Sequence, residues 1–472
     1  MIFRSVPLAL VFLGSAALAA PATHDDPRGL IPVAPPPLSV RQAPCGEVPA
    51  GPLTLPDLVD IALCRNPATA ASWAAVRVAA AQIGIARAAE LPNVNLSVGP
   101  TLSSSKSFQD TGFIDANGNL VSGSSVLTQV NSSARLAVNY LIFDGGGRRA
   151  QIDSASAQQR AALASYADTA QGVVLNVVTA YNSLAANRAI ETANLANLAF
   201  ATQSRDLAAA RKRAGVATAA DRLQGETQAA QAELTLIQTR GSIATAAAQL
   251  AVAVGLPPTR RLDLAPAAPL ASGDRLKMGA DNLIADAERM RPDIIAARAN
   301  VDAATANVRA AQSAGRPSLT VQGANTISAI DTTIDRNVAS AGLSLSVPLF
   351  SGWNTRYNIA AARARLEQQT ALAEQTRQQA GLDVYSNYVA FDNALSSLAT
   401  ARVLVTSATQ SADLAQGRYK AGVGTFADLL NAQNALASAR QQLAQNEFNV
   451  RTNNAQLARA VGNIGEAIDA QR

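Results

Sequence analysis

Few residues in this sequence of 472 have a type and spacing that could support chemistry. The only histidine is His24, close to the N-terminus, and we recognise no metal-ligand cluster, phosphate-binding loop or nucleophile elbow. The run Gly145-Gly146-Gly147 lacks the context of a nucleotide-binding loop and is interpreted as a turn. We therefore expect no enzymatic activity, no cofactor and no metal site.

The two cysteines, Cys45 and Cys64, could form a covalent link. In an oxidising compartment they could pair and tie the N-terminal segment to the first helix. A loop of that size stabilises a fold by about 3 kcal/mol in the chain-entropy description. Two free, buried thiols are the alternative.

Two aspartates, Asp221 and Asp428, close two related stretches, RAGVATAAD and KAGVGTFAD. Each stretch ends a long proline-free run, and a returning helical run follows it. Gly215 and Gly422 suit the end of a helix, where a left-handed residue is favoured. One role for both aspartates is therefore to cap or solvate the returning helices.

The two stretches belong to an internal repeat. A shift of 207 residues aligns them without a gap, and 10 of the 17 residues from Arg205 to Asp221 are identical to their partners. Upstream the shift is 225, which matches Pro67 with Pro292. We expect a first repeat over residues 53–256, a linker over 257–280 and a second repeat over 281–472.

Each repeat contains two segments in which apolar and polar residues alternate, which indicates β-strands. They form hairpins at about 93–143 and 318–350. The first hairpin has the longer loop, QDTGFIDANGNLVSGSS against DTTIDRN, because the two shifts differ by 18 residues.

The flanking segments have helical composition instead. Alanine makes up much of the apolar content, and the 66 residues of 148–213 contain no proline. A helix of that length spans about 100 Å at 1.5 Å per residue. Its counterpart is expected from about Asn354 to Lys420. Such unbroken helices favour a coiled coil or helical barrel over a compact bundle.

The N-terminus has the features of a secretory signal. Arg4 precedes an apolar segment, and Ala17-Leu18-Ala19 is a small-x-small cleavage site, so we expect a signal peptide over 1–19. A membrane anchor is the alternative. Residues 20–52, rich in proline and alanine, are interpreted as an extended segment. Basic and acidic residues are interspersed, so we expect no nucleic-acid partner.

Four strands with one apolar and one polar face have two interpretations. In a soluble sandwich the apolar face would be hidden inside. In a membrane, four strands are too few, because the smallest barrels have about 8. An open sheet would also leave edge N–H and C=O groups without partners in lipid. If these strands span a membrane, several chains must therefore close one barrel with a wet lumen.

The same strand-to-helix join occurs in both repeats. Glycines allow a sharp turn from a tilted strand into a helix, and an aromatic residue suits the membrane interface. The join residues are Phe143, Gly145 and Gly146 in the first repeat and Pro348, Phe350 and Gly352 in the second. Trp73 and Trp353 are interpreted as packing or interface residues.

In this order and duplication, the LTLPDLVDIAL start, the NYLIFDGG and VPLFSGW joins, and the two glycine-containing turns resemble the TolC family over residues 53–465. The resemblance implies a mainly α-helical chain with a membrane β-barrel portion: a two-repeat protomer of long coiled helices and four β-strands. Three copies would close a twelve-strand β-barrel and a twelve-helix α-barrel. It also implies the outer membrane of a Gram-negative bacterium, with a periplasmic helical tunnel.

The resemblance also implies a periplasmic gate. Asp428 matches one carboxylate of an acidic ring that would attract cations, whereas Asn431 stands where a second acidic residue is common. Tyr419 and Asp221 match a pair that ties neighbouring coils. A family arginine near Gly424 is absent here.

The turns at the helical ends have a second implied role. The resemblance suggests that Gly215, Val216, Gly422 and Val423 meet the periplasmic adaptor protein. The implied function is a passive exit duct of a tripartite efflux pump or type I secretion system. Its partners would be the adaptor, an inner-membrane RND or ABC transporter and outer-membrane lipid. The alternative is a trimeric coiled-coil adhesin or structural stalk, although adhesins usually carry their strands at the C-terminus.

Overall fold

The computed structural model describes residues 51–114, 120–265, 278–330 and 333–465, with residues 26, 29–32, 116 and 118. The expected signal peptide and Cys45 lie outside this part, as do most of the extended segment and residues 266–277 of the linker. Cys64 lies on the exposed side of the first helix. The Cys45–Cys64 disulfide therefore stays a prediction.

The described chain is mainly helical, and its elements occur in two equivalent series. The first series is α1 (Leu55–Arg65), α2 (Pro67–Ala88), β1 (Asn93–Ile114), β2 (Leu120–Phe143), α3 (Gly147–Arg213) and α4 (Ala219–Ala253). The second is α5 (Ala280–Met290), α6 (Pro292–Ser313), β3 (Ser318–Ile330), β4 (Thr333–Ser346), α7 (Asn354–Lys420) and α8 (Phe426–Val461). The two expected long helices are confirmed, and both contain 67 residues.

The helices begin where the sequence offers caps. Thr54 caps α1 in a capping box with Asp57, and proline stands in the first turn. Asn66 caps α2 through its side chain, and Arg291 holds the equivalent position before α6. Local chemistry therefore sets these boundaries.

The four strands form one antiparallel sheet in the order β1-β2-β3-β4, so β1 and β4 are its edges. The expected long loop of the first hairpin is instead mostly strand, because β1 and β2 stay paired out to Ile114 and Leu120. Gln109, Ser124 and Ser125 of this segment pair across the ladder. The second hairpin ends at Ser346 rather than near residue 350, and Pro348 beyond it has no N–H to donate.

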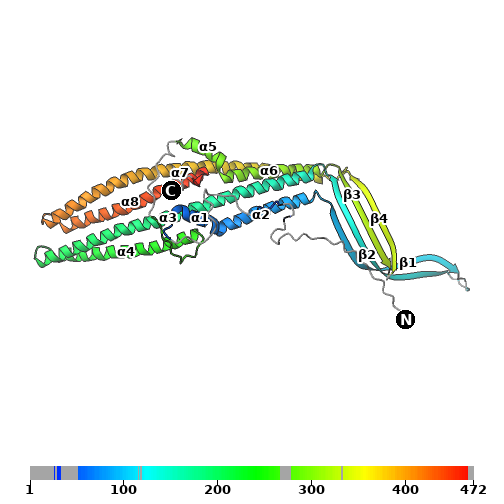
Figure 1. Cartoon of the computed structure of the whole chain (residues 1–472), viewed down its shortest axis with the longest axis horizontal. Helices are drawn as coiled ribbons and strands as arrows, with labels where there is room; N and C mark the ends of the chain where they lie inside the picture. The colour runs from blue at the N-terminus through cyan, green and yellow to red at the C-terminus, as the bar shows by residue number, and fades with distance from the viewer. Residues whose placement is uncertain are drawn as a thin grey trace.

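No element in the described chain covers the apolar face of the sheet. Leu96, Val98, Leu343 and Leu345 are each at least 65% exposed. Figure 1 shows the sheet at one end of an elongated molecule, away from the helical body. This arrangement contradicts the soluble sandwich, which would bury these side chains.

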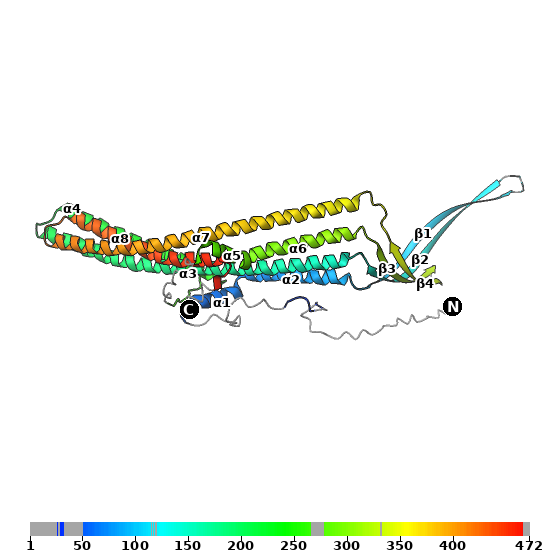
Figure 2. The same cartoon turned by 90° about the horizontal axis from the view of Figure 1, so that it is seen from above.

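The helices form a long, thin body in which α3 is central. It packs against α2 and α6 on the side toward the sheet, and against α4 and α8 toward the far end. Seen from above, α7 and α2 lie on opposite sides of this layer (Figure 2). The helix turns after α3 and α7 meet at the end opposite the sheet (Figures 1 and 2).

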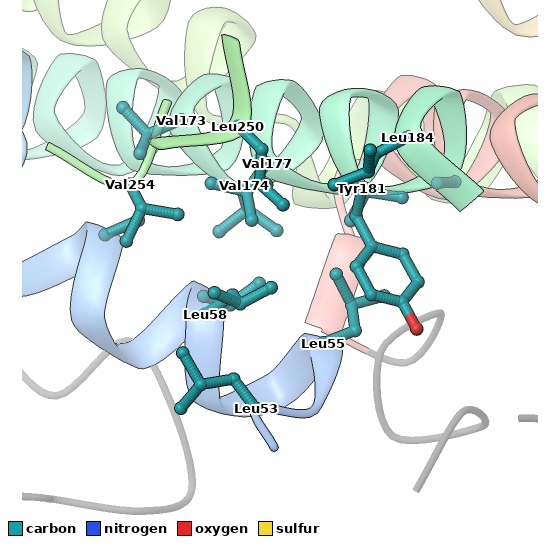
Figure 3. Packing of buried hydrophobic residues seen from close by; sticks show 14 of the residues in the cluster. Leu53, Leu55, Leu58, Val173, Val174, Val177, Tyr181, Leu184, Leu250 and Val254 are labelled. Atoms are coloured by element: carbon teal, nitrogen blue, oxygen red, sulfur yellow. The ribbon is translucent and has the colours of Figure 1, made fainter. Parts of the chain in front are cut away.

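A hydrophobic cluster fixes α1 to the body. Leu55 and Leu58 of α1 pack on Val173 and Val177 of α3 (Figure 3). Leu250 and Val254 of α4 complete the cluster. Fully burying each such side chain stabilises the fold by about 1.5–3 kcal/mol.

No helix in the described part of the chain is both long and apolar enough to cross a membrane.

Each return helix ends against the junction of the two short helices in its own repeat: α4 against the α1–α2 junction and α8 against the α5–α6 junction. Gly255 and Gly462 both have positive φ, and a Cβ at Gly255 would lie 2.8 Å from the Arg65 carbonyl oxygen. In the second repeat, a Cβ at Gly462 would lie 3.0 Å from the backbone of Met290 and Arg291. Glycine is required at these contacts for both space and conformation.

Candidate functional site

The two helix turns at the far end of the body have the same hydrogen bonds. Gly215 and Gly422 have φ values of 76° and 79°. The amide of Val216 donates to the Arg211 carbonyl and that of Val423 donates to the Arg418 carbonyl, each at 3.0 Å. These are glycine-centred helix ends of the Schellman type.

Both aspartates cap the returning helices. The Asp221 amide donates to the Thr218 hydroxyl and the Asp428 amide donates to the Thr425 hydroxyl, each at 3.1 Å. In return, each carboxylate accepts from the backbone N–H of its threonine. The capping role is therefore observed, and any role in a gate would be additional to it.

The hydrogen bonds also affect the acidity of Asp428. Bonding to the Thr425 side chain and then to its backbone lowers the pKa of Asp428, and the charge of Arg418 lowers it further. The carboxylate thus stays charged at neutral pH, although it is solvent exposed. Asn431 lies exposed on α8, one turn beyond it.

Tyr419 lies at the centre of a small cluster that joins the two repeats. Its ring is 4% exposed and packs 5.3 Å from the Phe426 ring, with Ala208 and Leu429 in the same cluster. Burial raises the pKa of Tyr419; the charge of Arg211 opposes this effect and that of Asp221 adds to it. The hydroxyl has no hydrogen-bond partner among the described residues, so within one chain it does not bond to Asp221.

Arg211 is a tip residue that the sequence interpretation missed. From the end of α3 it donates to the Tyr419 carbonyl oxygen, and its guanidinium carbon lies 4.7 Å from the centroid of the Tyr419 ring. Its Nε atom is buried without a partner in the described chain. The 207-residue shift aligns Arg211 with Arg418, and this match could have identified Arg211 as a tip residue from the sequence.

Gly424 lies where the family arginine was expected. A Cβ there would approach the Arg418 backbone and Cβ at 3.1–3.2 Å, so a larger side chain fits this turn poorly. The structure therefore places a guanidinium beside Tyr419 from α3 rather than from the turn before α8.

The outermost side chains of the turns are apolar. Val216 is 63% exposed and Val423 is 70% exposed. Together with the glycines beside them, these valines form two small, exposed apolar surfaces at the end of the molecule. Nothing in the described chain packs over them.

Buried polar contacts tie α3 to α8 behind the tips. The amide of Gln433 donates to the Ser204 hydroxyl at 2.8 Å. Further from the tips, Gln441 donates to Asn194 at 2.6 Å, and Asn194 donates to Thr239 of α4 at 2.8 Å. Because buried amides need partners, these contacts favour one register between the repeats.

A polar cavity of about 320 Å³ lies where α6 begins, between α3, α7 and α8. Arg291 bridges Asp293 at 2.7 Å and Asp383 at 3.2 Å beside it. Burial alone would raise the pKa of Asp293, but the hydrogen bond and charge of Arg291 lower it overall. Arg291 also donates to the Ala460 carbonyl, as Asn66 does to Ala253 in the first repeat. The cluster therefore holds the start of α6 in place.

The strand-to-helix joins differ between the repeats. Gly145 and Gly146 have positive φ, and Gly145 is packed under Arg316, which donates to its carbonyl at 2.8 Å. In the second join, Gly352 is unpacked and Trp353 has a φ of 67° at the position equivalent to Gly146.

The aromatic side chains of the joins are exposed. Phe143 is 53% exposed and Phe350 is 75% exposed, and the Phe350 ring lies edge-on to Trp353 at 5.8 Å. Pro348 follows the end of β4.

Among the described residues, no group of three or more His, Cys, Asp or Glu side chains is placed to hold a metal ion.

Comparisons with known proteins agree with this architecture. A family model described as outer membrane efflux protein matches residues 58–256 and 283–463, which include both repeats. Protein CyaE of Bordetella pertussis is 31% identical over 446 residues, with 92% of this chain and 90% of the relative covered. Outer membrane efflux protein BepC of Brucella suis is 25% identical over 333 residues, with 70% and 72% covered.

A solved structure of the outer-membrane channel OprN has the same fold. It superimposes with a TM-score of 0.75 at 23% identity, with 86% of this chain and 89% of that chain covered. This similarity supports the combination of a helical body with a strand portion.

Proposed function

Because this chain belongs to the outer membrane efflux protein family, we propose that three copies of it close one β-barrel and one helical tunnel around a shared pore. The chain is an outer-membrane channel protein for efflux or secretion, as the family match over both repeats and its relatives indicate. The family is one of channels, and nothing in the comparisons favours the adhesin.

The sheet supports closure by several chains. It has two unpaired edges, β1 and β4, and an exposed apolar face. In lipid, unpaired strand edges cost several kcal/mol per unsatisfied group, so edge β4 of one copy must pair with edge β1 of another. The polar residues of the alternating strands then line a wet lumen.

The tips support a gate and a docking end. In a trimer, Asp428 of each copy would contribute to a ring of charge, and Asn431 would add none. The Tyr419 hydroxyl, which has no hydrogen-bond partner among the described residues, and Asp221, whose charge acts on it within the chain, would tie neighbouring coils of the gate. The exposed Val216 and Val423, with Gly215 and Gly422, would contact a periplasmic adaptor. An inner-membrane RND or ABC transporter would supply the energy.

Single-channel recording in planar bilayers tests this function. The purified protein should insert as a trimer, conduct ions passively and be blocked by trivalent cations added on the tip side. A folded trimer that inserts but never conducts would overturn the proposal and favour a structural stalk.

The cargo class can be separated in a deletion strain. Loss of a small-molecule efflux route should increase sensitivity to drugs or metal ions. Loss of a secretion route should instead retain a polypeptide inside the cell. Complementation with the intact gene distinguishes either effect from general damage to the outer membrane.

A further inference from the structure

The packing of α3 on α6 joins the two repeats within one chain. One of its contacts is an ion pair in which Arg160 of α3 lies 2.9 Å from Asp302 of α6. Both side chains remain more than half exposed. The pair therefore marks the register of two neighbouring helices without being buried between them.

The internal repeat relates this helix pair to another one. Helix α7 is equivalent to α3, since both have 67 residues and are related by the 207-residue shift. Helix α2 is equivalent to α6, since both have 22 residues and are related by the shift of 225. Within the chain α7 and α2 lie on opposite sides of the helical layer (Figure 2). A contact equivalent to α3–α6 therefore requires a second copy.

The two shifts place opposite charges at the equivalent positions. Arg160 corresponds to Glu367 on α7, and Asp302 corresponds to Arg77 on α2. The signs are exchanged, but the pair remains complementary. Glu367 and Arg77 are both exposed, and neither forms an ion pair with any residue in the described ranges.

We propose that Glu367 of one copy forms an ion pair with Arg77 of the neighbouring copy, in the place that Arg160 and Asp302 occupy within each chain. This inference rests on the proposed trimer and specifies its interface. Around the closed ring, the intrachain pair and the interchain pair alternate with exchanged charge.

The neighbouring residues restrict the register of this contact. Arg363 is exposed one turn before Glu367 on α7. A slip by one turn would bring Arg363 toward Arg77, and two like charges in contact are unfavourable. The interchain ion pair therefore selects one alignment of α7 on α2.

A second ion pair between α3 and α6 has uncharged residues at the equivalent positions of the proposed interface between copies. Arg309 and Asp153 lie 3.2 Å apart between α6 and α3. Their equivalents are Gly84 and Ala360, which are small and uncharged and allow close approach of the helices. Leu30 of the N-terminal segment lies 3.9 Å from a Cβ built at Gly84, so this segment borders the interface at that height.

Site-directed cross-linking tests the contact directly. An exposed ion pair contributes little to stability, so a geometric measurement is more decisive than a melting temperature. The variant Arg77→Cys/Glu367→Cys, treated in outer-membrane vesicles with a short thiol-specific cross-linker, should give products of two and three chains on a denaturing gel. The parent chain should give none.

Matched controls define the geometry. Arg160→Cys/Asp302→Cys should cross-link at the mass of one chain, because both residues belong to the same copy. Ala70→Cys/Glu367→Cys should not cross-link, because Ala70 lies on the same face of α2 but about 10 Å further along the axis. Cross-linking through Ala70 and not Arg77 would overturn the proposed register.

Charge exchange gives an independent readout. Arg77→Glu or Glu367→Arg alone should lower the temperature at which the trimer dissociates in detergent, and the double exchange should restore it. A parent chain that never forms a trimer would overturn the proposed function. A normal trimer in which Arg77→Cys and Glu367→Cys fail to cross-link would overturn only this inference.

Discussion

The guanidinium of Arg211 lies over the ring of Tyr419, with its central carbon 4.7 Å from the ring centroid, and it also donates to the Tyr419 carbonyl oxygen. The two residues end the long helices of different repeats and are 208 positions apart. One arginine thus ties the two tip turns of the chain to each other.

Arg211→Met should loosen this tie. A charge-assisted hydrogen bond and a cation–π contact are lost, which should cost about 1–3 kcal/mol of unfolding free energy. The closed tunnel should also conduct more, because the two helical hairpins are no longer held together. Single-channel conductance measures this, with the exposed neighbour Lys212→Met as the control. Equal conductance in both variants would contradict the role of Arg211.

Tyr419→Phe should separate stability from gating. Within the described chain the hydroxyl has no partner, so its removal should change the unfolding free energy by less than about 1 kcal/mol. In the proposed gate the hydroxyl and Asp221 tie neighbouring coils, so conductance should rise when the hydroxyl is removed. Tyr181→Phe, far from the tip, serves as the control. If the conductance of Tyr419→Phe equals that of the parent, the pair does not belong to the gate.

Asp428→Asn and Thr425→Ala should distinguish the ring from the cap. The asparagine removes the charge and keeps a hydrogen-bond acceptor, so trivalent-cation block should weaken while α8 stays stable. The alanine removes the cap and keeps the charge, so stability should fall by about 1 kcal/mol while block persists at neutral pH. Circular dichroism and single-channel block measure the two effects. The same loss of block in both variants would argue against a charged ring.

The pH dependence of block should report the lowered pKa of Asp428. A carboxylate with a depressed folded-state pKa contributes stability above its ordinary value, 3.8, and loses it as pH falls through the folded pKa. The hydrogen bonds from Thr425 should therefore lower the pH at which block is lost in the parent. In Thr425→Ala it should disappear at a higher pH, because the largest cause of the shift is removed. Block that vanishes at the same pH in both proteins would refute this link.

Gly255→Ala should be severely destabilising. A Cβ there would lie 2.8 Å from the Arg65 carbonyl oxygen in a backbone of positive φ, so we expect a loss of about 2 kcal/mol or more. Gly241→Ala is the matched control, since it lies within α4 with nothing within 4 Å. Helix propensity predicts that it is neutral or stabilising by up to about 1 kcal/mol. Thermal unfolding compares the two, and equal stability would contradict the close contact at Gly255.

Much of the fold could be predicted from local pattern. The 67-residue helices, the capping residue Thr54 and the alternation of the strands follow from periodicity and capping, which act within a few residues. The extent of the first hairpin could not be predicted in this way. Its polar residues have weak strand character alone, and those that are paired stay extended because the partner strand satisfies their backbone groups.

The tip shows the same limit. The sequence indicated Asp221, Tyr419 and Asp428 as tip residues, and its repeat aligned Arg211 with Arg418. It did not show that Arg211 covers Tyr419, that the Tyr419 hydroxyl is buried without a partner in the described chain, or that both aspartates are occupied as caps.

By itself, the sequence determined the duplicated series of elements and the positions of their turns, because these depend on residues close together along the chain. Only the tertiary structure decided which helix of one repeat lies against which helix of the other. That choice depends on the shape and charge of surfaces that meet after folding, across some two hundred residues, and no local pattern encodes it.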